Sequence, residues 1–176
     1  MPRPVRIYVG SSPVKKVVRD GVTLYQYAAK FAASTGNAKI FYSDDGIVWM
    51  EATGVSSSAG SHRSIIRAGG KYIAVASGVV SWSDDGITWH ATNLVSRSYV
   101  YDVAYGNGRF VIVGDDALFF YSDNGETWIQ AAVPASKARN VCYDGTQFVA
   151  YKPTGMIVVS TDGNEWTQKE SGSVTP

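Results

Sequence analysis

Arginine and tyrosine side chains recur at matching places along this sequence, and they are the residues best suited to do chemistry. When segments of similar pattern are aligned, one column contains Lys15, Arg63, Tyr101 and Arg139, and a second contains Arg19, Arg67, Tyr105 and Tyr143. Guanidinium groups form paired hydrogen bonds with anions and stack on aromatic rings. We therefore predict a site for an anionic or sugar-like ligand, formed by Arg63, Arg67, Tyr101, Tyr105, Arg139 and Tyr143. The alternative is that these side chains merely cap strand ends at the surface.

Carboxylates are poorly placed for glycosidase chemistry, which usually needs two of them, or a tyrosine nucleophile with an acidic partner. The four glutamates fall in predicted turns or on predicted outer strands: Glu51, Glu126, Glu165 and Glu170. Asp102 is the one acid on a predicted inner strand. We therefore expect a protein that is not an enzyme, with a glycosidase as a remote alternative.

No cofactor or metal site is predicted. The sequence lacks the Gly-Lys-Ser/Thr of a phosphate-binding loop and the spaced oxygen ligands of a calcium loop. His62 and His90 are far apart, and a single cysteine, Cys142, excludes an internal disulfide. Cys142 aligns with Ile66 and Ala104 and is predicted to be a small buried residue.

One motif occurs four times, at residues 42–49, 82–89, 121–128 and 159–166. The first copy reads Tyr-Ser-Asp-Asp-Gly-Ile-Val-Trp, and the closing tryptophans of the four copies are 40, 39 and 38 residues apart. A near-constant period of this length is typical of repeat and propeller architectures. In the fourth copy Thr161-Asp162 replaces Asp-Asp or Asp-Asn, so the acid moves by one place.

Each motif predicts a β-hairpin, because glycine takes a positive φ in the turn, aspartate accepts backbone N–H bonds and tryptophan packs into the core. Two strand-like runs around a glycine turn precede each motif, at residues 15–27, 63–75, 101–113 and 139–151. Together they give four antiparallel strands per repeat. The structural turn residues are predicted to be Ser43, Asp44, Gly46, Trp49, Ser83, Asp84, Gly86, Trp89, Ser122, Asp123, Gly125, Trp128, Ser160, Asp162, Gly163 and Trp166.

The four motifs resemble the Asp-box, or BNR, repeats of sialidase-like β-propellers, whose pattern is Ser-x-Asp-x-Gly-x-x-Trp. This sequence usually carries Tyr or Trp first and Ser second, as in the wider BNR/WD40-like group. The resemblance covers residues 15–170 and implies that the boxes are structural and lie on outer turns. Similar repeats occur in bacteriophage tail and capsid-associated proteins.

The expected fold class is therefore all-β, a four-bladed β-propeller of antiparallel four-stranded blades. The predicted blades span residues 15–54, 62–94, 99–134 and 137–170, and residues 171–176 form a tail. We expect one chain to close the ring; the alternative is half of a larger two-chain propeller. Blade one carries seven or eight extra residues near 30–39, which predict either a protruding binding hairpin or an insertion without a role.

Residues 1–14 are predicted to form a basic arm, since residues 1–19 contain five basic and no acidic side chains. Residues 5–9 resemble one more strand, expected to pair with the last outer strand or with a partner's sheet edge. The predicted assembly residues of this arm are Arg3, Arg6, Ile7 and Tyr8. Docking on an acidic surface fits this charge, and a solvated terminus is the alternative.

Composition limits the partners that the chain is expected to bind. The formal net charge is +1, which gives no general attraction to nucleic acid. No apolar run is long enough to span a membrane, and no signal peptide is visible. We expect a structural or attachment component of a larger assembly, most specifically a bacteriophage virion, with other protein subunits and a host-surface glycan as partners. The alternative function is a lectin-like carbohydrate-binding module, and the remote one is a sialidase-like glycosidase. The alternative to a virion is a cytoplasmic or extracellular location.

Overall fold

A computed structural model gives the arrangement of the chain. It describes the backbone of four short strands, at residues 8–9, 12–13, 16–19 and 22–26, and it describes residues 28–94, 99–115, 118–133, 138–151 and 155–169 with their side chains. The predicted arm residues Arg3, Arg6 and Ile7 and the predicted tail lie outside the described residues, and of Tyr8 the backbone alone is described.

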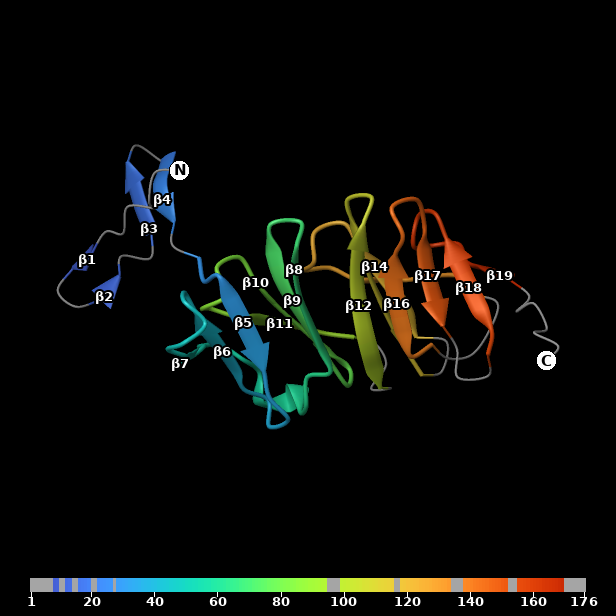
Figure 1. Cartoon of the computed structure of the whole chain (residues 1–176), viewed down its shortest axis with the longest axis horizontal. Helices are drawn as coiled ribbons and strands as arrows, with labels where there is room; N and C mark the ends of the chain where they lie inside the picture. Colours follow the sequence, from blue (N-terminus) through green and yellow to red (C-terminus); the bar gives the residue numbers. More distant parts are fainter. Residues whose placement is uncertain are drawn as a thin grey trace.

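Four antiparallel sheets, here called blades 1 to 4, form the main body of the protein (Figure 1). Within blades 2 to 4 each strand pairs with the next one along the chain. Blade 1 contains β5 (Phe31–Ser34), β6 (Ile40–Ser43) and β7 (Met50–Glu51). Blade 2 contains β8 (Ser64–Ala68), β9 (Lys71–Ala76), β10 (Val79–Ser83) and β11 (His90–Asn93). Blade 3 contains β12 (Val100–Gly106), β13 (Arg109–Gly114), β14 (Phe119–Ser122) and β15 (Ile129–Gln130). Blade 4 contains β16 (Asn140–Tyr143), β17 (Phe148–Tyr151), β18 (Ile157–Ser160) and β19 (Thr167–Lys169).

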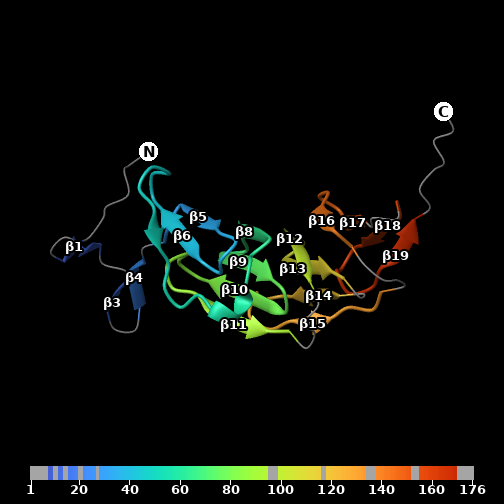
Figure 2. The ribbon, with the colours of Figure 1, turned by 90° about the horizontal axis from the view of Figure 1, so that it is seen from below.

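The predicted fold class, an all-β four-bladed propeller of antiparallel blades, is confirmed. A 3-10 turn, η1 (Ser57–Ala59), lies between the strands of blades 1 and 2. Figures 1 and 2 show the blades side by side in chain order, with blades 1 and 4 at opposite ends. The structure therefore shows a row of blades rather than a ring closed between the first and the last.

Blade 1 is built differently from the prediction. The strands expected to begin it, β3 (Lys16–Arg19) and β4 (Val22–Gln26), pair with each other in a separate two-stranded sheet. Their place beside β6 is taken by β5, which pairs with β6 from Phe31↔Ser43 to Ser34↔Ile40. The segment 30–39, expected to be an insertion, therefore supplies β5, which corresponds to the second strand of the other blades, and the turn that follows it; blade 1 has three strands rather than four.

The predicted strand at residues 5–9 is described only from Tyr8 to Val9, as β1. It pairs with β2 (Ser12–Pro13), a neighbour in sequence, and not with the outer strand β19 of blade 4. A close neighbour closes a short loop at low entropic cost, which favours this local hairpin over a distant pairing.

The four box turns share one hydrogen-bond pattern. The box serine accepts a bond from the glycine N–H at 2.8–2.9 Å, and the residue two after the serine accepts two backbone bonds at 2.8–3.0 Å. The accepting residues are Asp45, Asp85, Asn124 and Asp162. The fourth copy is therefore not shifted, and the predicted turn acids Asp44, Asp84 and Asp123 do not accept these bonds. Asp84 and Asp123 instead bind Lys71 and Arg109, each at 2.6 Å.

The hydrophobic core lies between neighbouring blades, where the apolar side chains of adjacent sheets pack against each other. One core joins Ile40 of blade 1 to Trp89 of blade 2, and another joins Phe119 of blade 3 to Trp166 of blade 4. Each blade therefore has two apolar faces, and burial of both requires a blade on either side.

Candidate functional site

Three residues lie just before the first strands of blades 2, 3 and 4. Arg63, Tyr99 and Arg139 each immediately precede the first strand of their blade. The N–H of Arg63 donates to the Val75 carbonyl at 2.9 Å, and the N–H of Arg139 donates to the Tyr151 carbonyl at 3.0 Å. These bonds extend the strand ladders by one residue, so the backbone positions of the two arginines are fixed by the sheets.

Tyr101, the second residue of β12, lies between these positions. The Arg139 guanidinium lies over its ring at 4.3 Å and that of Arg63 at 5.3 Å. Arg63 also lies 5.2 Å from the ring of Tyr99, which stacks on Tyr101 with 6.4 Å between ring centroids. We call Arg63, Tyr99, Tyr101 and Arg139 the arginine–tyrosine surface. The structure thus brings together three predicted residues, and sequence reasoning missed Tyr99.

Asp115 fixes the central ring of this surface. The Tyr101 hydroxyl donates to the Asp115 carboxylate at 2.8 Å. That hydrogen bond, followed by burial and the charge of Asp115, raises the pKa of Tyr101 above its usual value, while Arg139 and Arg63 oppose the shift. The phenol therefore stays protonated at neutral pH and holds one orientation.

This arrangement suits binding of an anion next to a flat apolar group. Arginine side chains stacked on aromatic rings keep their N–H groups free to point outward, and a guanidinium can hold a carboxylate or sulfate through two bonds. Arg63, Arg139 and Tyr99 are exposed, so these groups face solvent. The surface therefore offers positive charge together with an aromatic ring that is open to stacking.

The second predicted row, Arg67, Tyr105 and Tyr143, is not brought together in the same way. Tyr105 packs against Gly69 of the preceding blade, and Tyr143 packs against Gly106 in the same manner. Both tyrosines also contact a phenylalanine of their own blade. Packing between blades therefore accounts for these two rings.

Arg67 lies apart from that packing. It is exposed, and its guanidinium lies 5.1 Å from the ring centroid of Tyr72. With Phe31 and Tyr72 it lines a hollow between β5 and β8.

Asp102, the candidate acid of the glycosidase alternative, has a local role. Its carboxylate accepts a bond from its neighbour Val103 at 2.9 Å and another from the Val141 N–H at 3.1 Å. Because Val141 lies in β16, Asp102 links the inner strands of blades 3 and 4.

Two remaining predictions concern isolated residues. Cys142, predicted to be buried, is exposed, because among the described sheets none covers this face of blade 4. His62 is buried and contacts Ser81 at 3.2 Å, and this burial lowers its pKa. In the part of the chain that the structure describes, no cluster of histidine, cysteine or acidic residues could hold a metal ion, and no helix could cross a membrane.

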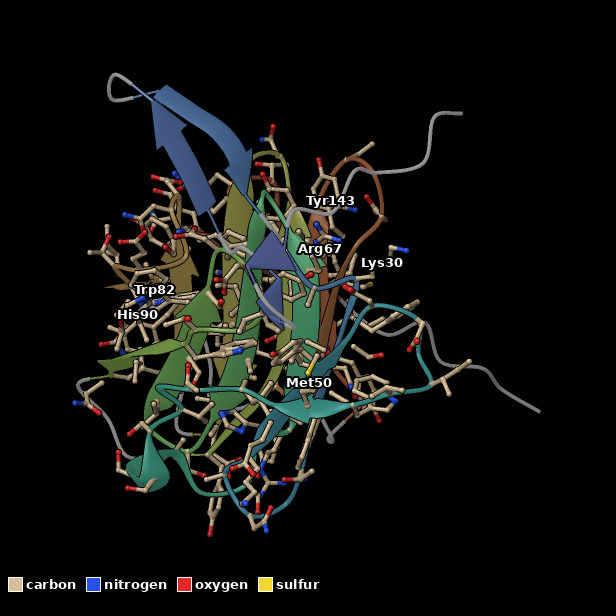
Figure 3. The ribbon with its side chains drawn as sticks, turned by 90° about the vertical axis from the view of Figure 1, so that its left-hand side faces the viewer. Lys30, Met50, Arg67, Trp82, His90 and Tyr143 are labelled. Carbon is tan, nitrogen blue, oxygen red and sulfur yellow. The ribbon has the colours of Figure 1, made fainter. Side chains whose placement is uncertain are left out.

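Figure 3 views the molecule from the blade 1 end and labels residues of several blades. Trp82 and His90 lie side by side there, with their rings stacked at 4.4 Å between centroids. Lys71 lies 4.7 Å over the Trp82 ring. This cluster joins the two outer strands of blade 2 and belongs to the sheet rather than to the arginine–tyrosine surface.

No family model and no curated protein matches the chain. Among solved structures, it is similar to a catalytically inactive virginiamycin B lyase from Staphylococcus aureus, with a TM-score of 0.62 and 11% identity over 89% of this chain and 61% of that one. It is also similar to the computationally designed Ika4 protein, with a TM-score of 0.60 and 11% identity over 74% of this chain and 83% of that one. YCF48 bound to D1 peptide gives a TM-score of 0.51 and 15% identity over 81% of this chain and 46% of that one.

The chain has a β-propeller fold. At these identities the likeness extends to the fold alone. The chain spans about half the length of YCF48 and about three fifths of the lyase.

Proposed function

We propose that this chain is a non-catalytic β-propeller that serves as an attachment component of a larger assembly, of the kind found in bacteriophage virions. Its ligand is an acidic glycan, bound by the arginine–tyrosine surface. The observation that carries this proposal is the stacking of Arg63 and Arg139 on the half-buried ring of Tyr101, which presents two cations beside the exposed ring of Tyr99.

The chemistry of the surface matches a sugar that carries a carboxylate or a sulfate. Each guanidinium can form two parallel hydrogen bonds with such a group, and charge-assisted bonds are about twice as strong as neutral ones. The exposed Tyr99 ring gives the apolar face of a sugar ring a partner. A neutral sugar would gain stacking without the paired bonds.

The nearby carboxylates support binding without turnover. Asp115 accepts the Tyr101 hydroxyl, and Asp102 accepts two backbone N–H groups. Both are engaged in holding the surface or the blades. Glycosidase chemistry requires a carboxyl group free to move a proton at the scissile bond.

The solved structures are compatible with both binding and catalysis. YCF48 is a protein solved with a bound peptide, whereas virginiamycin B lyase is an enzyme by its name. The test of this proposal therefore includes a measurement of turnover.

We would titrate the full-length chain with sialylated, uronate-containing and sulfated oligosaccharides and with their neutral counterparts, by calorimetry. We expect binding of acidic glycans alone. Arg139→Ala should weaken that binding about tenfold, because it removes a charge-assisted pair. Arg67→Ala is the matched control, since Arg67 is also exposed and also lies over a tyrosine ring.

Equal weakening by Arg139→Ala and Arg67→Ala would contradict the proposed surface, and so would the absence of binding to every acidic glycan. Prolonged incubation with each bound glycan, followed by chromatography, measures turnover. A cleaved product would show that the chain is an enzyme.

A further inference from the structure

Each blade has a leading face, which meets the preceding blade, and a trailing face, which meets the following one. On the leading faces of blades 2 and 4 the box tryptophans are buried, with Trp89 2% and Trp166 6% exposed. Among the residues that the structure describes, no blade covers the leading face of blade 1, and its Trp49 is 41% exposed. The strand positions that are buried in blade 4 are also uncovered in blade 1, where they are occupied by Phe31, Ala33 and Phe41.

The trailing face of blade 4 is uncovered in a complementary way. In blade 3, Val111 and Phe119 of this face are fully buried against blade 4. The corresponding residues of blade 4, Val149 and Ile157, are only half-buried, and Cys142 beside Val149 is exposed. An apolar row runs across this sheet from strand to strand, since Cys142 pairs with Val149 and Val149 pairs with Val159.

The two uncovered faces carry residues at the two positions that form an aromatic contact between blades 3 and 4. Trp166 of blade 4 packs edge-on against Phe119 of blade 3, with 4.9 Å between ring centroids. Ile157 occupies the place of Phe119 in blade 4, and Trp49 occupies the place of Trp166 in blade 1. The trailing face of blade 4 is therefore shaped to receive a leading face such as that of blade 1.

The residues at the edge of the blade-to-blade contact are also compatible between the two end faces. Between blades 2 and 3, Lys71 at the start of the second strand pairs at 2.8 Å with Glu126 in the next box turn. Blade 4 carries the uncharged Gln147 at the place of Lys71, and the box turn of blade 1 carries the uncharged Ile47 at the place of Glu126. In blade 2 the same box position, Ile87, is 3% exposed, whereas Ile47 is 82% exposed.

We infer that two copies of this chain join blade 4 of each to blade 1 of the other and so close one ring of eight blades. For the three strands of blade 1, the contact repeats the blade-to-blade packing found within the chain, so each uncovered face meets a face like the one that covers its counterpart. A rotation of half a turn about the ring axis relates the two copies, as in the commonest class of homo-oligomer. The inference does not depend on the proposed ligand.

A second copy fits these faces better than an unrelated partner. Each end carries apolar residues beside one lysine, Lys39 on blade 1 and Lys169 on blade 4. The box tryptophan has a matching position on the opposite end, and neither Gln147 nor Ile47 carries a charge.

The native mass of the full-length chain tests the inference by light scattering after size-exclusion chromatography. We expect a particle of twice the 19.0 kDa chain mass. Ile47→Arg should give a monomer, because it places a charge in the apolar contact. Ile129→Arg is the matched control, since Ile129 is an exposed isoleucine on the outer strand of blade 3, away from both end faces.

A charge pair supplies a second and independent measurement. Ile47→Glu alone should separate the copies, and Ile47→Glu with Gln147→Lys should restore the dimer by recreating the Lys71–Glu126 pair of blades 2 and 3. Circular dichroism verifies that each variant is folded. A monomeric wild type, a mass other than two chains, a dimer insensitive to Ile47→Arg, or a failure of the double variant to restore the dimer would overturn the two-copy ring.

Discussion

Asn124 stands where the other three box turns carry aspartate, and its side-chain oxygen accepts the same two backbone bonds, at 2.9 and 3.0 Å. The turn therefore needs an acceptor at this position rather than a charge. Where the acceptor is a carboxylate, the bonds favour its ionised form: the N–H groups of Val48 and Ile47 lower the pKa of Asp45. Sequence reasoning identified the boxes but gave the turn role to the preceding acid, because two adjacent aspartates look equivalent until the turn geometry is known.

Asp85 provides the test at this scale, because it accepts bonds from both Ile87 and Thr88 at 2.8 Å. We expect Asp85→Ala to lower the free energy of unfolding by about 1–2 kcal/mol, since two backbone donors lose their partner. Asp85→Asn should lower the free energy of unfolding much less, because the side-chain oxygen of Asn124 accepts the same two bonds in blade 3. Urea denaturation of both variants decides the matter, and equal losses would show that charge is what the turn requires.

At the scale of the elements, the contact between neighbouring inner strands depends on a glycine facing an aromatic ring. A side chain at Gly69 or Gly106 would overlap the ring of Tyr105 or Tyr143 from the next blade. These two tyrosines, predicted to bind a ligand, therefore pack between blades instead. The alignment placed them at equivalent positions, but alternation along a strand does not reveal which residue a neighbouring blade will cover.

Gly106→Ala should destabilise the protein by about 1–3 kcal/mol, because the added methyl group has to displace the Tyr143 ring in a packed interface. Gly106 does not adopt a positive φ, so backbone strain does not contribute. In a Tyr143→Ala background the same substitution should be nearly neutral. A double-mutant cycle by thermal or urea unfolding measures this coupling, and additive losses would contradict the proposed contact.

The structure of blade 1 shows where prediction of the elements failed. Residues 16–26 alternate around Asp20-Gly21, which is a good hairpin signal, and the structure does form a hairpin there. The true second strand, however, is short and rich in alanine and gave little strand signal of its own. A positional signal was present: Phe31 lies 12 residues before Ser43, as Phe110 lies 12 before Ser122.

At the scale of the whole molecule, the blades and their order were predictable because four boxes at one period identify the repeat unit. Whether the ring closes could not be predicted, since closure depends on the angle between blades and not on the sequence pattern within any of them. The arginine–tyrosine surface could be predicted in part. Alignment placed Arg63, Tyr101 and Arg139 in one column, and the side-by-side arrangement of blades 2 to 4 brings them together.

The two uncovered faces also predict how stability depends on protein concentration. If folding and pairing are linked, the midpoint of thermal unfolding should rise by a few degrees for each tenfold increase in concentration, because association stabilises the folded chain by mass action. Ile47→Arg should abolish that dependence while Ile129→Arg retains it. Differential scanning calorimetry over a hundredfold range of concentration provides the measurement, and a midpoint that does not change for the wild type would argue against pairing.

The positions of Arg63, Tyr99 and Arg139, each just before a first strand, have one more consequence. All three lie at the same end of their strands, so the arginine–tyrosine surface belongs to one rim of the blade row. A half-turn about the ring axis keeps that rim on the same side, and a two-copy ring would present two such surfaces in one direction. Ligands fixed on a cell surface could then engage both, and the second contact would form at a high effective concentration. Through this avidity, two individually weak sites would hold the assembly firmly on the ligand-bearing surface.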